Sequence, residues 1–242
     1  MAKQIVDLSP QHYARICGVL YLYIIAAGIF AESVRSKLVV SADAAATARN
    51  ILSNESLFRI GFSGELLHLA CDVAVATILY MLLRPVNRNL ALLAAFMRLA
   101  CDIVLAVASL SHFAVLRLLH NADYLQGFQP DQLQTLALLA LKLHGDGYAI
   151  SLVFFGFACL ALGYLVFRSG YLPRTIGALL AIAGACYLTN SFALFLHPAF
   201  AARLFPAILL PCFVAELALA LWLVVKGVNV ARWREAELSS TQ

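Results

Sequence analysis

Apolar residues occur in six long runs along this chain, and polar residues gather in the segments between them. Each run approaches the ~20 residues that a helix needs to cross the hydrocarbon core of a membrane. The pattern therefore predicts an all-α integral membrane protein, a single bundle of six transmembrane helices over residues 1–242. The predicted spans are Tyr13–Phe30, Ile60–Leu83, Leu90–Leu116, Tyr148–Phe167, Thr175–Leu196 and Leu204–Val225.

Two of the polar connections carry a helical pattern of their own. Residues 43–54 place apolar positions on one face behind Asp43, a residue type that caps helices, and residues 130–143 open with a proline. We expect two short amphipathic helices on the exoplasmic membrane face. In the segment HGDG that follows the second, Gly145 is expected to end that helix and Asp146 to cap the next span.

Composition agrees with a membrane protein, since 63% of the residues are hydrophobic and only 12% are charged. The net charge of +4 is not a nucleic-acid footprint, because Lys and Arg stand beside the apolar runs and form no stripe of their own. The expected partner is the lipid bilayer, with no nucleic acid. All six cysteines fall inside apolar runs and none forms a CxxC pair, which argues against a disulfide framework or a zinc knuckle.

Basic residues mark one side of the membrane. They precede the first span, fill the second and fourth connections and follow the last span, and the short connections among these carry no acidic residue. The positive-inside rule then places both termini in the cytoplasm. The residues concerned are Lys3, Arg15, Arg84, Arg88, Arg168, Arg174, Lys226, Arg232 and Arg234.

Ionisable residues inside the second and third spans are the first candidates for function. A charge at bilayer depth costs a few kcal/mol and therefore faces a partner or a wet cavity. In the second span Glu65, His68 and Asp72 follow one helical face at i, i+3 and i+7. The short turn between the two spans makes them antiparallel neighbours, with Asp72 and Asp102 both roughly 18 Å from the turn, near mid-membrane.

On the third span, Arg98, Asp102, Ser109 and His112 form a single stripe. Arg98 is expected on the cytoplasmic side of the aspartates and Glu65 near His112 on the outer side. Arg98 and Asp102, at i and i+4, can simply neutralise one another and fasten the helix pair.

Carboxyl groups outnumber the single arginine among these residues, with Glu216 on the last span adding a further acid. Protonated carboxyls, an imidazolium or a bound cation would each relieve the surplus. Glu216 follows Pro206 and Pro211, which are expected to bend the last span, and it can converge on the same cavity or pair with Arg98. Tyr187 on the fifth span is expected to form an interhelical hydrogen bond.

A metal site is a further interpretation of the same residues. Glu65 and His68 have the spacing of carboxylate-bridged metal sites in helical bundles. With His112 they are the candidate ligands, and His112, Asp102 or His144 would complete the shell.

The residues also resemble a known family. The similarity is carried by RICGVLYLYIIAAGIFAE from Arg15, by DAAATARNI, LFRIG and YMLLRPV, and above all by the block from Phe154 to Gly177. These segments resemble bacterial multi-pass membrane proteins grouped as the domain of unknown function numbered four-three-eight-six. The resemblance implies about six helices in a bacterial cytoplasmic membrane. It implies no activity, substrate or cofactor.

Three functions are compatible with this pattern. The first is binding or transport of a proton, cation or small polar ligand, with His68, Glu65 and His112 as an outer gate and Arg98 closing the cytoplasmic side. The second is an intramembrane enzyme that uses a metal or paired carboxyls on a lipid-like substrate, although no HExxH or GxSxG motif is present. The third is a scaffold or sensor whose charges only specify helix pairing. The size is compatible with a homodimer.

Overall fold

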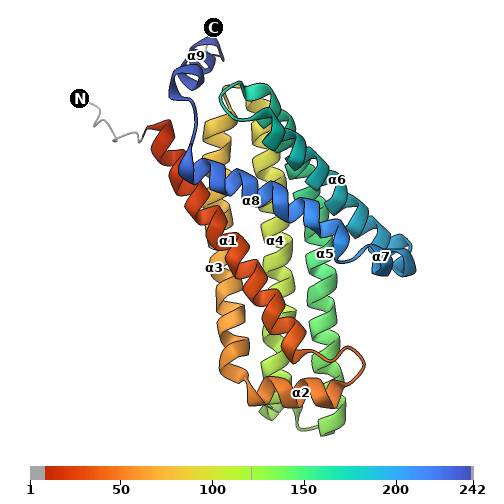
Figure 1. The fold of residues 1–242 in the computed structure, drawn as a ribbon. Helices are drawn as coiled ribbons and strands as arrows, with labels where there is room; N and C mark the ends of the chain where they lie inside the picture. Colours follow the sequence, from red (N-terminus) through yellow and green to blue (C-terminus); the bar gives the residue numbers. More distant parts are fainter. Residues whose placement is uncertain (1–8, 121, 241–242) are drawn as a thin grey trace, which may run out of the picture. The chain divides into compact units, whose positions relative to one another are not determined.

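The computed structural model describes residues 9–120 and 122–240, and this part of the chain is helical throughout, apart from its turns (Figure 1). Lys3 lies outside the described residues. The helices are α1 (Pro10–Leu38), α2 (Ala44–Ser53), α3 (Glu55–Leu83), α4 (Arg88–Leu119), α5 (Pro130–Ser169), α6 (Arg174–Leu196), α7 (Pro198–Leu204), α8 (Leu210–Val225) and α9 (Val230–Ser240), with 3₁₀ turns η1 (Asp123–Leu125) and η2 (Ala207–Leu209).

Among the described residues, six segments are long and apolar enough to cross a membrane, which confirms the predicted fold class. They are Pro10–Leu38, Glu55–Leu83, Arg88–Leu119, Pro130–Ser169, Arg174–Leu196 and Ala207–Val225. Helices suit this environment because each one satisfies its own backbone hydrogen bonds where no water can do so. Large apolar side chains such as Ile103 and Leu110 of α4 are 65% and 70% exposed, as expected of surfaces in contact with lipid.

The fourth span differs from its predicted form. The expected surface helix over residues 130–143 and the span from Tyr148 are one continuous helix of 40 residues, α5. The prediction that Gly145 ends one helix and Asp146 caps another was wrong. A glycine inside a helix costs only about 1 kcal/mol, and Gly147 allows a close helix contact that would be lost if the chain turned there.

The last span also differs from its prediction. The structure has no mid-helix bend at the prolines: Pro206 precedes η2, and Pro211 stands in the first turn of α8, where a missing N–H costs no hydrogen bond. Two short helices, α7 and α9, were not predicted, because neither is apolar and long enough to register as a span. The predicted cap of α2 is confirmed, since Ala46 N donates to Asp43 Oδ1 at 2.8 Å.

The chain divides into two compact units. The first consists of Met1–Tyr23, Cys71–Cys101 and Leu152–Gln242, and the second of Ile24–Ala70 and Asp102–Ser151. Both units draw on α1, α3, α4 and α5, because each of these helices passes from one unit into the other. The six cysteines are free thiols, in agreement with the absence of a predicted disulfide framework.

Glycines bring α5 and α6 together in the first unit. A Cβ atom added at Gly163 would lie 2.7 Å from Ala181 N and 2.8 Å from Gly177 O, and one added at Gly156 would lie 3.1 Å from Gly184 O. Real Cβ atoms do not approach backbone atoms at 2.7–2.8 Å, so Gly163 admits only glycine at this helix separation, and so does Gly184, whose added Cβ would lie 2.7 Å from Gly156 O. The antiparallel pairs Gly156/Gly184 and Gly163/Gly177 therefore fix the contact by backbone packing, as small residues commonly do in membranes.

The end of α3 in the same unit is held by two side chains that donate to one carbonyl. Trp233 Nε1 of α9 and the Tyr171 hydroxyl lie 2.9 Å and 2.7 Å from Leu82 O. Arg84 and Glu237 add an ion pair at 3.1 Å. Burial raises the pKa of the Tyr171 phenol, which therefore stays a neutral donor. These contacts anchor α9 on the end of α3.

The second unit has its own apolar core, which includes Leu38, Ile51, Phe58, Val115 and Leu141. These residues belong to α1, α2, α3, α4 and α5, so every helical segment of the unit longer than η1 contributes to it. The short helix α2 thus packs its apolar face on the longer helices of the unit.

Candidate functional site

Glu65, His112 and His144 converge in the second unit, from α3, α4 and α5. His112 Nδ1 lies 3.2 Å and His144 Nε2 lies 3.7 Å from Glu65 Oε2. One ligand atom of each residue lies within 4.8 Å of the other two. The predicted proximity of Glu65 and His112 is confirmed, and the third member is His144, which the sequence offered among several candidates.

The local packing explains how His144 reaches this position. Gly147 lies one helical turn after His144, and a Cβ atom there would stand only 2.4 Å from Ala108 Cβ. Its missing side chain lets α5 approach α4 closely at this level. The HGDG segment therefore serves close packing and supplies an imidazole, instead of ending a helix.

Ser109 and two phenylalanines surround the cluster. The Ser109 hydroxyl lies 2.5 Å from Glu65 Oε1, which leaves Oε2 directed toward the imidazoles. Phe58 and Phe62 meet the His112 ring edge-on, with centroids 4.6 Å and 5.6 Å away. An apolar shell and a hydrogen-bonded carboxylate are the usual surroundings of a metal ligand set.

The cluster is largely shielded from solvent. The side chains of Glu65, His112 and His144 are 10%, 16% and 13% exposed. Two imidazoles and a carboxylate form a donor set that suits Zn²⁺ and other first-row divalent cations.

Two predicted candidates lie outside this group of three. His68 is half-buried on α3, and Asp102 is buried on α4 with 7% exposure. Both belong to the second unit. The imidazole that joins Glu65 and His112 in the structure is that of His144, which spacing along α3 could not rank above His68.

The first unit contains a different buried cluster, built on Arg98. Its Nε and Nη2 atoms donate to Asp72 Oδ2 and Oδ1 at 2.7 Å and 2.5 Å, a two-pronged pair with side-chain exposures of 1% and 5%. The guanidinium also stacks over the rings of Tyr21 and Phe155, at 4.7 Å and 5.0 Å from their centroids. Bidentate geometry and stacking are what a buried arginine needs to compensate its lost hydration.

Glu216 joins this cluster through tyrosines. The Tyr21 hydroxyl donates to Glu216 Oε2 at 3.1 Å and accepts from Arg98 Nη1 at 3.4 Å, and the Tyr187 hydroxyl donates to Glu216 Oε1. Glu216 is therefore linked to Arg98 through Tyr21, and the predicted interhelical bond of Tyr187 is confirmed. Sequence reasoning missed Tyr21, since a tyrosine in a membrane span carries no charge to draw attention.

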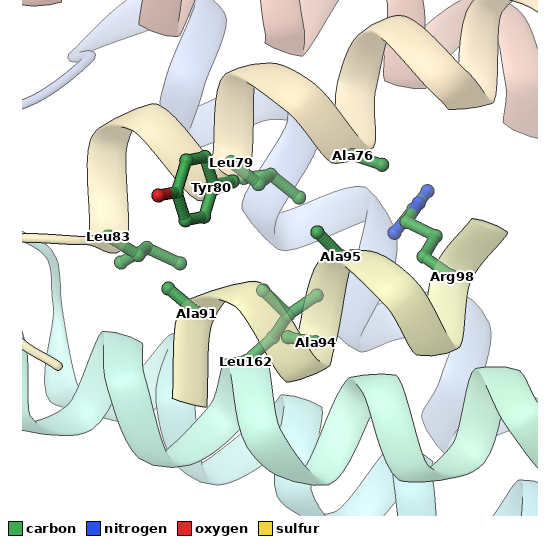
Figure 2. A pocket seen from close by; sticks show the side chains of 9 residues that line it. All are labelled: Ala76, Leu79, Tyr80, Leu83, Ala91, Ala94, Ala95, Arg98 and Leu162. Carbon is green, nitrogen blue, oxygen red and sulfur yellow. The ribbon is translucent and has the colours of Figure 1, made fainter. Parts of the chain in front are cut away.

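Figure 2 shows a small pocket beside Arg98 in the first unit. Its free volume is only about 10 Å³, and it is lined mainly by alanines and leucines of α3 and α4, with Leu162 of α5. Ligand pockets are usually far larger, ~300–1,000 Å³, and offer several polar groups. We therefore place the candidate chemistry in the two polar clusters.

The family model described as "Domain of unknown function (DUF4386)" matches residues 16–227 of this chain. The chain belongs to this family. A relative from Archaeoglobus fulgidus, described as an uncharacterized protein, is 31% identical over 164 residues, which are 68% of this chain and 82% of the relative. No solved structure matches the chain. The DUF4386 description carries no activity, so function rests on the geometry of the clusters.

Proposed function

We propose that this DUF4386 protein binds a divalent transition-metal cation through Glu65, His112 and His144. The observation that carries the proposal is the convergence of these side chains from three different helices. In a tetrahedral shell with bonds of ~2.0–2.1 Å, neighbouring ligand atoms stand about 3.3 Å apart. The separations of 3.2 Å and 3.7 Å to Glu65 Oε2 are close to that value, and all three ligand atoms lie within 4.8 Å of one another, so side-chain rotations that draw the two imidazoles together would complete the site.

Electrostatics favours an ion over an empty cluster. The polar partners that the structure gives Glu65 are Ser109 and the two histidines, and none of these is a permanent cation. A divalent cation would neutralise the carboxylate and occupy the imidazole lone pairs at once. Binding inside a multi-pass membrane protein is the first step of cation transport, and we favour that role.

A metal-dependent enzyme is the second candidate, because three protein ligands leave a fourth position for water or substrate. Its substrate would be lipid-like, since the surrounding surfaces are apolar. Turnover separates the two: a transporter moves the ion across a vesicle membrane without consuming a lipid, whereas an enzyme changes the lipid without net ion flux.

We place the protein in a bacterial cytoplasmic membrane with both termini in the cytoplasm. The basic turns that hold Arg84, Arg88, Arg168 and Arg174 support this orientation.

Metal content of the purified full chain tests the proposal. The protein is stripped with a chelator, reloaded with Zn²⁺ or Co²⁺, and its metal is measured by mass spectrometry, with the visible spectrum of Co²⁺ reporting the ligand geometry. We expect one ion per chain. Loss of a group that only hydrogen-bonds to a metal ligand weakens metal sites by ~10–100-fold, so His144→Gln, which removes a proposed ligand itself, should weaken binding by more than that range.

Two histidine variants serve as matched controls. His120→Gln removes an exposed imidazole that contacts Glu55 in the same unit, and it should bind metal normally. His68→Gln separates the ligand set of the structure from the one inferred from sequence spacing, and it too should keep the ion. Metal-free protein after reloading, or equal affinity of His144→Gln and wild type, would overturn the proposal and leave the scaffold role.

A further inference from the structure

The cluster in the first unit contains two carboxyl groups and one permanent cation. Asp72 receives both prongs of the Arg98 guanidinium, so these two charges compensate each other at bonding distance. Among the described residues, the hydrogen bonds to Glu216 come from the neutral hydroxyls of Tyr21 and Tyr187. With both carboxyls ionised the cluster would carry a net charge of −1 in a site where Glu216 is 8% exposed.

Within the part of the chain that the structure describes, the groups around Glu216 offer no second permanent cation. The titratable and charged groups that interact with it or with its neighbours are Cys17 and Tyr21 of α1, Asp72 of α3, Arg98 and Cys101 of α4, Cys159 of α5, Cys186 and Tyr187 of α6, and Cys212 of α8. Arg98 is the only permanent cation in this set, and Asp72 already engages it. An uncompensated carboxylate in an apolar interior takes up a proton.

We infer that Glu216 is a proton-binding site, with Tyr21 and Tyr187 as the hydroxyls that stabilise its ionised form. This site is independent of the metal site proposed above, since it uses other residues in the other unit. In the ionised state both tyrosine hydroxyls donate to the carboxylate. On protonation an O–H bond forms on Glu216, the proton coming from water, and that O–H needs an acceptor.

The acceptors within reach are the hydroxyl oxygens of Tyr21 and Tyr187, which already contact the two carboxyl oxygens. Release reverses the step: the O–H bond breaks, the proton returns to water, and both hydroxyls again donate to the carboxylate.

Infrared spectroscopy of the full chain in lipid nanodiscs tests this site. A protonated carboxyl has a carbonyl stretching band that vanishes on ionisation, and the titration should extend to about pH 9, the upper range documented for buried acids. We expect such a band in the wild type and its loss in Glu216→Gln. Labelling the glutamate carboxyls with ¹³C shifts glutamate bands alone, which identifies the residue type even if that variant does not fold.

Tyr187→Phe measures the part played by the tyrosine. Removal of a donor to the ionised form should move the midpoint of the band to higher pH. Tyr164→Phe, on an exposed α5 position, is the matched control and should leave the midpoint in place. A spectrum without a titrating glutamate band, or a band that survives Glu216→Gln, would overturn the site, and a midpoint that Tyr187→Phe leaves unmoved would overturn the role of Tyr187.

Discussion

Replacement of Arg98 by leucine should damage the first unit more than any single loss of a carboxylate. Arg98 is 1% exposed and holds Asp72 with two hydrogen bonds. Removing one partner of a buried pair costs about 3–5 kcal/mol, which lowers the folding equilibrium constant by roughly a hundredfold to several thousandfold, since ~1.4 kcal/mol is tenfold. The leucine variant leaves two carboxyls and no cation in the cluster.

Asp72→Asn should lower the free energy of unfolding by no more than about 2 kcal/mol, the cost of weakening the buried hydrogen bonds between residue 72 and Arg98. Arg98 keeps its bond to Tyr21 and its stacking contacts, and Glu216 can release its proton to balance the guanidinium. Ionisation of Glu216 in this variant would lower the intensity of its carboxyl band at neutral pH, which links this prediction to the proton site.

Unfolding of the purified protein in mixed micelles with increasing dodecyl sulfate, followed by circular dichroism, measures these costs. Arg117→Leu is the matched control, because Arg117 lies exposed on the same helix and surface changes usually stay within ~0.5 kcal/mol. The double variant of Arg98 and Asp72 should cost less than the sum of the single changes, with a coupling of up to ~3 kcal/mol. Equal destabilisation by Asp72→Asn and Arg98→Leu would show that Glu216 does not compensate the Arg98 charge when Asp72 is lost.

Two further predictions concern packing and orientation. Gly163→Leu should destabilise the protein by about 1–3 kcal/mol, the usual cost of overpacking, and so lower its melting temperature in detergent. Gly145→Leu is the control and should not, because no atom lies within 4 Å of its added Cβ. Equal melting points for the two variants would mean that α5 and α6 separate freely here. For orientation, a cysteine at Asn89 should resist an impermeant thiol reagent in intact cells and one at Asp123 should react, with the wild-type chain as background; the inverse pattern would reverse the topology.

The spans could be predicted because hydrophobic length is a local property of the sequence. Asp72 and Arg98 drew attention for the same reason, as charges inside apolar runs. The sequence could not show that Asp72 is the residue that pairs with Arg98, because the alternative at i+4, Asp102, satisfies helical spacing equally well. That choice depends on the rotation of α3 against α4, which spacing along one helix does not determine.

His144 and Tyr21 illustrate what sequence reasoning loses. His144 lies in a glycine-rich segment that local rules assign to a turn. In the structure α5 continues through this segment, and Gly147 packs closely against Ala108. Tyr21 is an ordinary residue for a membrane helix, and its importance comes from two partners 77 and 195 positions away in the chain. Both depend on tertiary packing.

The unbroken length of α5 has a consequence for where an ion would enter. Its 40 residues extend about 60 Å, twice the ~30 Å thickness of a hydrocarbon core. The Ser169 end leads within a few residues into α6, another candidate span, so we expect the excess length at the Pro130 end, in the interfacial layer and water. His144, about 38 Å along the helix from Ser169, would then lie on this excess part. An ion held there would exchange with the aqueous compartment opposite the α5–α6 turn without first crossing hydrocarbon.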